Sequence, residues 1–190
     1  MKISIYSLAF SLLFLAACSS SSNKNQNDIT SEATVSKDAG PESPVKTAAT
    51  TELLNSYLKL KNAFTTDNDK EAAEAGNEMV AGFTSFDIES LTPEQSKAYT
   101  DIKDDAKEHA EHIAANVGNI KHQREHFDIL SKDMYDLVKL LGANRPLYVD
   151  QCPMYNDNKG AIWLTEVREI KNPYLGKGMP TCGSVKEELK

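Results

Sequence analysis

The sequence predicts a mainly α-helical fold: an antiparallel four-helix bundle followed by a C-terminal irregular lobe that contains short β pieces. Three observations support this prediction. Four stretches between residues 51 and 142 place apolar residues at helical spacing, with only short connections between them. One of these stretches begins with a complete capping signal. Beyond residue 142 the chain becomes rich in Pro, Gly, Asn and Asp, which are typical of turns and loops.

The first two helices are predicted from their apolar faces. The first begins near residue 51, in "TELLNSYLKLKNAF", and Lys61 is the one polar break in its apolar face. The second lies in "DNDKEAAEAGNEMVAGF", where Asp67 or Asp69 is the expected N-cap residue. The apolar face of this second helix consists of Ala72, Ala75, Met79, Val80 and Phe83.

The third and fourth helices have clearer boundaries. The stretch "LTPEQ" supplies an N-cap residue, a proline at the first helical position and the partner of a capping box, which are Thr92, Pro93 and Gln95. The sequence "VGN" at 117–119 breaks the third helix, and a fourth is expected over about 120–141. Gly142 suits the position just after that helix.

The segment from residue 143 to residue 190 is too short and too polar to hold a core of its own. Short strands are expected at "LYV" (147–149) and "AIWLTEV" (161–167). We therefore expect this lobe to pack on the helices, with Trp163 as its main apolar anchor.

The N-terminal sequence predicts an export signal. The run "ISIYSLAFSLLFLAAC" is too short to span a membrane and is shaped like the core of a signal peptide, which would occupy residues 1–17. Small residues before Cys18 resemble the lipobox of bacterial lipoproteins, in which this cysteine becomes the acylated first residue. An ordinary secretory peptide cut nearby, or an uncleaved anchor, is the alternative. The prediction is attachment to an envelope membrane, the outer membrane first, on its periplasmic or surface side.

Residues 18–50 are small and polar, so we expect a disordered tether between the lipid and a single folded domain at 51–190. Within that domain, 51–142 would form the bundle and 143–190 the lobe. The formal net charge of −7 argues against nucleic acid as a partner, because such binding depends on basic side chains. The membrane is expected as a partner only through the lipid.

No enzyme is predicted. The sequence contains no G-x-S-x-G, H-E-x-x-H or P-loop pattern. A hydrolase that uses Cys152 or Cys182 with His126 is formally conceivable, but an oxidising compartment disfavours a free thiol nucleophile.

Two sulfur pairs mark the ends of one short segment. "CPMY" contains Cys152 and Met154, and "GMPTCG" contains Met179 and Cys182. Thiolates and thioethers are soft ligands that suit Cu(I). A Cys152–Cys182 disulfide, which closes a loop of about thirty residues and stabilises by roughly 3.5 kcal/mol, is an equal alternative on these grounds. The two states could also interconvert, since reduction exposes the ligands.

The four histidines form two pairs, and all belong to the third and fourth predicted helices: His109, His112, His122 and His126. Folding this hairpin about residue 118 would bring all four toward one end. Histidines at i and i+4, as at 122 and 126, can chelate a metal ion. For His109 and His112 we favour solvated or hydrogen-bonded side chains on the polar flanks of the third helix.

Several motifs together resemble a known domain family. In order they are "HQREHF" from residue 122, "CPM", "GAIW", "NPY" and the final Met179 with Cys182. They resemble a family of unknown function from bacterial envelopes, found as stand-alone lipoproteins and at the C-terminus of periplasmic adaptor subunits of copper and silver efflux systems. The resemblance covers about residues 52 to 188. It implies a periplasmic domain that binds or hands on copper or a related metal, and it favours His126, then His122, beside the sulfurs. Gln123 is expected to hydrogen-bond the lobe onto the fourth helix.

The sequence therefore predicts a lipid-anchored envelope protein that binds a soft metal ion for chelation or for relay to an efflux adaptor or pump. The expected ion is Cu(I), with Ag(I) or Zn(II) after it. The expected ligands are Cys152, Met154, Met179, Cys182, His126 and His122. The alternative is a structural or interaction module that a Cys152–Cys182 disulfide holds together, without a metal.

Overall fold

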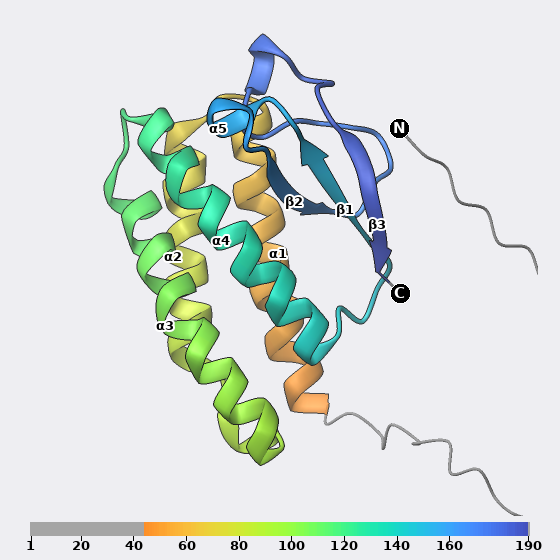
Figure 1. Cartoon of the computed structure of the whole chain (residues 1–190). Coiled ribbons are helices and arrows are strands. Elements are labelled where there is room, and N and C mark those ends of the chain that lie inside the picture. Colours follow the sequence, from red (N-terminus) through yellow and green to blue (C-terminus); the bar gives the residue numbers. More distant parts are fainter. Residues whose placement is uncertain (1–43, 190) are drawn as a thin grey trace, which may run out of the picture. The chain divides into compact units, whose positions relative to one another are not determined.

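The computed structural model describes residues 44–189. Four long helices come first, and a small three-stranded antiparallel sheet follows (Figure 1). The helices are α1 (Pro44–Thr65), α2 (Asp69–Ser85), α3 (Pro93–Ala115) and α4 (Ile120–Leu141). The prediction of a mainly helical fold with short β pieces is thus confirmed. The predicted signal peptide, the lipid-attachment residue Cys18 and most of the predicted tether lie outside the described residues.

The first two helices differ from prediction at their starts. Helix α1 begins at Pro44 rather than near residue 51, and proline suits the first position of a helix. Helix α2 is capped by Asn68, whose side-chain oxygen accepts the N–H of Glu71 at 3.2 Å. The prediction of Asp67 or Asp69 as the cap was therefore wrong. Among the described helices, none is long and apolar enough to cross a membrane.

Both aspartates beside that cap instead bind distant parts of the chain. Asp67 has a left-handed backbone, with φ of 55°, and its carboxylate accepts a hydrogen bond from Arg124. Asp69 is the first residue of α2, and its carboxylate accepts the N–H of Gly118 at 2.6 Å, in the turn between α3 and α4. Tertiary contacts thus decide which of three neighbouring polar residues becomes the cap.

The predicted boundaries of α3 and α4 are confirmed. Thr92 and Gln95 form the capping box, with both of its hydrogen bonds at 3.2 Å. Helix α4 begins after Asn119, whose side chain accepts the N–H of His122, and ends at Leu141 before Gly142 with φ of 83°.

Each helix packs against the next one in the chain: α1 on α2, α2 on α3 and α3 on α4. Phe127 of α4 occupies the centre of the core, where it is fully buried. Its ring lies 5.5 Å from Tyr57 and 5.1 Å from Phe64, both on α1, and 5.4 Å from Tyr174 in the C-terminal lobe. The helices and the lobe therefore share one core.

The lobe is more regular than predicted. Strands β1 (Leu147–Cys152) and β2 (Ala161–Thr165) confirm the two expected β pieces, and β3 (Ser184–Leu189) adds a third. The order is β2-β1-β3, with both pairings antiparallel. Short helical turns accompany the loops: η1 (Ile88–Ser90), α5 (Tyr155–Asn158) and η2 (Gly176–Gly178).

The sheet packs on the helices through β2, which contacts α4. Trp163 of β2 is fully buried, and its ring meets that of Tyr174 edge-on at 6.0 Å. Trp163 is thus buried as predicted, and the ring contact that the structure shows for it lies within the lobe.

A buried lysine of α1 and a buried aspartate of the sheet carry opposite charges inside the protein. Lys61 of α1 is 3% exposed and donates to the Thr165 hydroxyl at 3.4 Å, and Asp150 of β1 is completely buried. Burial lowers the pKa of Lys61 to about 8, against the opposing effect of the Asp150 charge. Burial raises the pKa of Asp150 to about 6, against the opposing effect of the Lys61 charge. Both groups are therefore charged at pH 7, and each stabilises the charge of the other.

We expect Lys61→Met to lower the free energy of unfolding by about 2 kcal/mol at pH 7.5, because it leaves the Asp150 carboxylate buried without a counter-charge. Loss of the Lys61 charge raises the pKa of Asp150 above its wild-type value of about 6, so the folded variant binds this proton at higher pH than the wild type does. The stability loss therefore shrinks as pH falls toward about 6 and stays small below it. Urea unfolding at pH 7.5 and 4.5 measures the difference. An equal loss at both values would contradict this account, and Lys61→Met combined with Asp150→Asn should recover most of the stability.

Candidate metal centre

The sheet brings the two predicted cysteine ligands together. Cys152 is the last residue of β1, and Cys182 lies just before β3, which pairs with β1. Both are free thiols, and their Sγ atoms are 3.2 Å apart. Cys152 is buried and Cys182 is partly exposed. One ion at the open side of this pair could therefore contact both sulfur atoms.

The two thiols are not equivalent. Burial alone would raise the pKa of Cys152, but hydrogen bonds from the Cys182 thiol, the Met154 and Tyr155 N–H groups and the Asn172 side chain outweigh burial and lower it. The pKa of Cys182 is raised, first because its thiol donates to Cys152 and then because of burial. Cys152 is therefore the first of the pair to become a thiolate, which is the form that binds metals.

The two predicted methionine ligands flank this pair through their backbones. The N–H of Met154 is directed at the Cys152 sulfur, and the N–H of Cys182 donates to the Met179 carbonyl at 3.3 Å. Their side chains are 51% and 43% exposed. Methionine has three rotatable bonds, so such exposed thioethers can reorient toward a nearby ion.

Asn172 organises the loop that carries Cys182. It is fully buried, and its side-chain N–H donates to the Cys182 carbonyl at 2.6 Å. Its side-chain oxygen accepts the N–H groups of Tyr174 and Leu175 at 2.8 and 2.9 Å. This explains why an Asn-Pro-Tyr stretch accompanies the cysteines.

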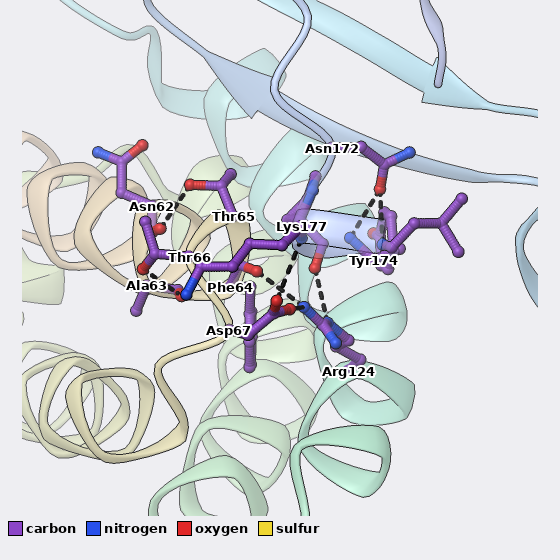
Figure 2. A network of polar contacts seen from close by, with 12 residues as sticks. Asn62, Ala63, Phe64, Thr65, Thr66, Asp67, Arg124, Asn172, Tyr174 and Lys177 are labelled. Carbon is purple, nitrogen blue, oxygen red and sulfur yellow. Dashed lines mark hydrogen bonds and ion pairs between the residues drawn. The ribbon is translucent and has the colours of Figure 1, made fainter. Parts of the chain in front are cut away.

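Arg124 joins α4 to the same loop (Figure 2). Its Nε donates to the Pro173 carbonyl at 2.7 Å, and one terminal nitrogen donates to the Phe64 carbonyl and the Asp67 carboxylate at 2.8 and 2.5 Å. Asp67 also accepts the N–H of Lys177 at 3.1 Å. One guanidinium thus connects α4, the α1–α2 connection and the lobe.

The prediction that Gln123 joins the lobe to α4 was wrong. The amide of Gln123 donates to the carbonyls of Asp69 in α2 and Ile113 in α3, both at 3.0 Å, and so does not bind the lobe. Successive helical residues differ by about 100° in direction, so Gln123 faces α2 and α3 while Arg124 faces the lobe.

All four histidines meet between α3 and α4. His109 Nδ1 is 2.9 Å from His126 Nδ1, and His126 Nε2 is 3.2 Å from His122 Nε2. The ring of His112 stacks on that of His126, with 4.3 Å between the ring centres. The sequence favoured separate hydrogen-bonded or solvated roles for His109 and His112. The sequence feature that indicates their contact with His126 is the folding of the hairpin about residue 118, which brings the two histidine pairs to the same end.

The predicted ligands therefore fall into two groups. His122 and His126 face α3, whereas the lobe contacts α4 through Arg124 and Asp128. Within the described part of the chain, no histidine shares a group of close potential ligand atoms with either cysteine.

Comparison with known proteins gives one result. Residues 53–146 match a family model described as "Protein of unknown function (DUF3347)". The matched region runs from α1 to the residue before β1, so it includes the four histidines and Arg124 but neither Cys152 nor Cys182. No curated protein and no solved structure matches the chain. A domain of unknown function is therefore supported over the helical part.

Proposed function

We propose that this protein binds a soft metal ion at Cys152 and Cys182, Cu(I) in preference to Ag(I) or Zn(II). The observation that supports this proposal best is the pair of free thiol sulfurs 3.2 Å apart at one edge of the lobe. A thiolate pair is a soft ligand set, and Met154 and Met179 would add thioethers, which suit Cu(I) far better than zinc. The four helices, as an antiparallel bundle, would serve as the scaffold.

In this proposal the protein is a lipoprotein held in the cell envelope through Cys18, and it chelates the ion or hands it to an efflux adaptor or pump. No bond-making chemistry is required. Because His122 and His126 contact the other two histidines, the sulfur site would use Cys152, Cys182 and the two methionines without them.

The proposal is tested by titrating the purified full-length protein with Cu(I) against a competing chelator, under mild reduction and without oxygen. We expect one tightly bound ion per chain. Cys152→Ser should weaken binding at least about 30-fold, since loss of a ligand costs no less than loss of a supporting contact. Met179→Leu should weaken it several-fold, whereas Met134→Leu, a change to a buried methionine of α4, should have no effect.

Cu(I) binding that survives Cys152→Ser would disprove this site. The same short sulfur distance also favours the alternative, a disulfide-stapled interaction module, because a disulfide needs the two sulfurs at about 2.0 Å. A thiol count on unreduced protein separates the two: no reactive Cys152 or Cys182 after purification, combined with no Cu(I) binding after reduction, would favour the staple.

A further inference from the structure

The four histidines form a cluster with its own supporting contacts, separate from the sulfur pair. His109 and His112 lie near the end of α3, and His122 and His126 near the start of α4, with only the short turn at 116–119 between the helices. His109 is 9% exposed, His122 and His126 are partly exposed, and His112 is exposed. The cluster therefore opens to solvent on one side.

Carboxylates beside two histidines assign the ring protons of those histidines. Ionised carboxylates only accept hydrogen bonds. His109 Nε2 lies 3.4 Å from Asp105, so Nε2 carries the proton and Nδ1 is an acceptor. His122 Nδ1 lies 3.3 Å from Glu125, so Nδ1 carries the proton and Nε2 holds a lone pair.

These two assignments determine which ring nitrogen of His126 carries its proton. Its Nδ1 lies 2.9 Å from the acceptor nitrogen of His109, so Nδ1 of His126 must be the donor and its Nε2 holds a lone pair. Nε2 of His126 and Nε2 of His122 therefore face each other with two lone pairs, 3.2 Å apart. Two neutral imidazoles in this arrangement repel each other unless a cation lies between them.

A metal ion fits the spacing, because two nitrogens bound to one tetrahedral ion at 2.0–2.1 Å lie about 3.4 Å apart. His112 supplies a third nitrogen: the ligand atoms of His112, His122 and His126 all lie within 4.8 Å of one another.

The acceptors that contact the second ring nitrogen of His122 and of His126 are of the kind found around metal sites. Histidine ligands usually donate their second ring N–H to a carboxylate or another acceptor, which orients the ring. Here His122 has Glu125, and His126 has His109, which in turn has Asp105. This surrounding charge favours a bound cation.

We propose that His112, His122 and His126 bind a borderline divalent transition-metal ion such as Zn(II) or Cu(II), with His109 as the residue that positions His126. Neutral imidazole suits these ions, whereas the sulfur pair suits Cu(I). Three protein ligands leave a fourth position to water or to a ligand from a partner. This site goes beyond the proposed function and does not depend on it.

The test uses Zn(II), titrated against a competing chelator, with full-length protein in which both Cys152 and Cys182 are serine. This background removes the sulfur ligands. We expect His112→Ala and His126→Ala each to weaken Zn(II) binding at least about 30-fold. The visible absorption of bound Co(II) should show tetrahedral coordination and disappear in both variants. Far-UV circular dichroism checks that the variants are folded.

His109 needs a separate readout, because it does not touch the ion. His109→Ala should weaken Zn(II) binding about 10-fold, while His109→Asn, which keeps an acceptor near the Nδ1 position, should restore much of it. Equal losses in both variants would overturn the positioning role.

If the serine background fails to fold, the wild-type protein provides the second measurement. Zn(II) should then shift the ring proton resonances of the four histidines in the NMR spectrum. Zn(II) affinity unchanged by His112→Ala and His126→Ala, or unshifted histidine resonances, would overturn the histidine site. Loss of Cu(I) binding only in the cysteine variants would leave the histidine proposal intact and test the sulfur site alone.

Discussion

Replacing Phe127 with alanine is expected to lower the free energy of unfolding by about 3–5 kcal/mol, the usual cost of removing a large aromatic side chain from a core. The ring is fully buried. It contacts Tyr57 and Phe64 of α1 and Tyr174 of the lobe. The cavity would therefore open where the helices meet the lobe, and neither side could collapse to fill it without moving the other.

Urea unfolding measures this loss, and two variants calibrate it. Phe127→Leu should cost about 1–2 kcal/mol, because leucine keeps much of the volume. Phe86→Ala should cost about 2 kcal/mol, since Phe86 is 8% exposed and stacks on a single ring, that of Tyr99. If Phe127→Ala cost no more than Phe86→Ala, the shared core between helices and lobe would be refuted. Two separate unfolding transitions in the wild type would refute it as well.

The helix boundaries could be predicted where they depend on neighbouring residues. The capping box of Thr92 and Gln95 is a local arrangement, and the structure contains both of its hydrogen bonds. The cap of α2 could not be predicted, because three polar residues in a row can each cap a helix. Contacts of Asp67 with Arg124 and of Asp69 with Gly118 decide in favour of Asn68, and these partners lie 57 and 49 residues away.

The sheet was predicted only where its strands are buried. Strands β1 and β2 carry apolar residues such as Val149 and Trp163, which gave the expected β pieces. Strand β3 reads "SVKEEL", with most of its residues exposed, and so resembles a loop. Backbone pairing with β1 holds it in place, and pairing leaves no trace in the apolar pattern.

The candidate site likewise contains one part that the sequence predicted and one part that depends on how the helices pack. The sequence indicated Cys152 and Cys182 as a pair because each lies close to a methionine at one end of a short segment, and the structure places their sulfurs side by side. The histidine cluster depends on how α3 faces α4, which small rotations of either helix would change. Sequence spacing placed all four histidines near one end of the hairpin, but not in ring-to-ring contact.

Replacing Arg124 with alanine is expected to lower the free energy of unfolding by about 3 kcal/mol, because it removes the donor from several buried or partly buried acceptors at once. The guanidinium serves the carbonyls of Phe64 and Pro173 and the carboxylate of Asp67. These acceptors belong to the end of α1, to the α1–α2 connection and to the lobe, so local loosening should appear near Pro173. Hydrogen exchange would detect it there before global unfolding.

Two further variants separate geometry from charge. Arg124→Lys keeps the charge but not the planar fork of donors, so it should recover less than half of the loss. Gly176→Ala keeps Arg124 and Asp67, yet a Cβ at this position, where φ is 52°, would collide with both. We expect it to be destabilising by a similar amount. Full stability of either Arg124→Ala or Gly176→Ala would show that the lobe is held by apolar packing alone.

The pH dependence supplies the final check on this contact. Burial would raise the pKa of Asp67, but the hydrogen bonds from Arg124 and the Lys177 N–H outweigh burial and lower it. A lowered pKa in the folded state adds stability that is fully present above the unfolded pKa of about 4 and is lost as pH falls through the folded value. The difference in stability between wild type and Arg124→Ala should therefore be constant from pH 5 to pH 7. It should narrow as pH falls from about 4 toward the lowered pKa of Asp67 in the folded wild type, because only the variant binds this proton in that range.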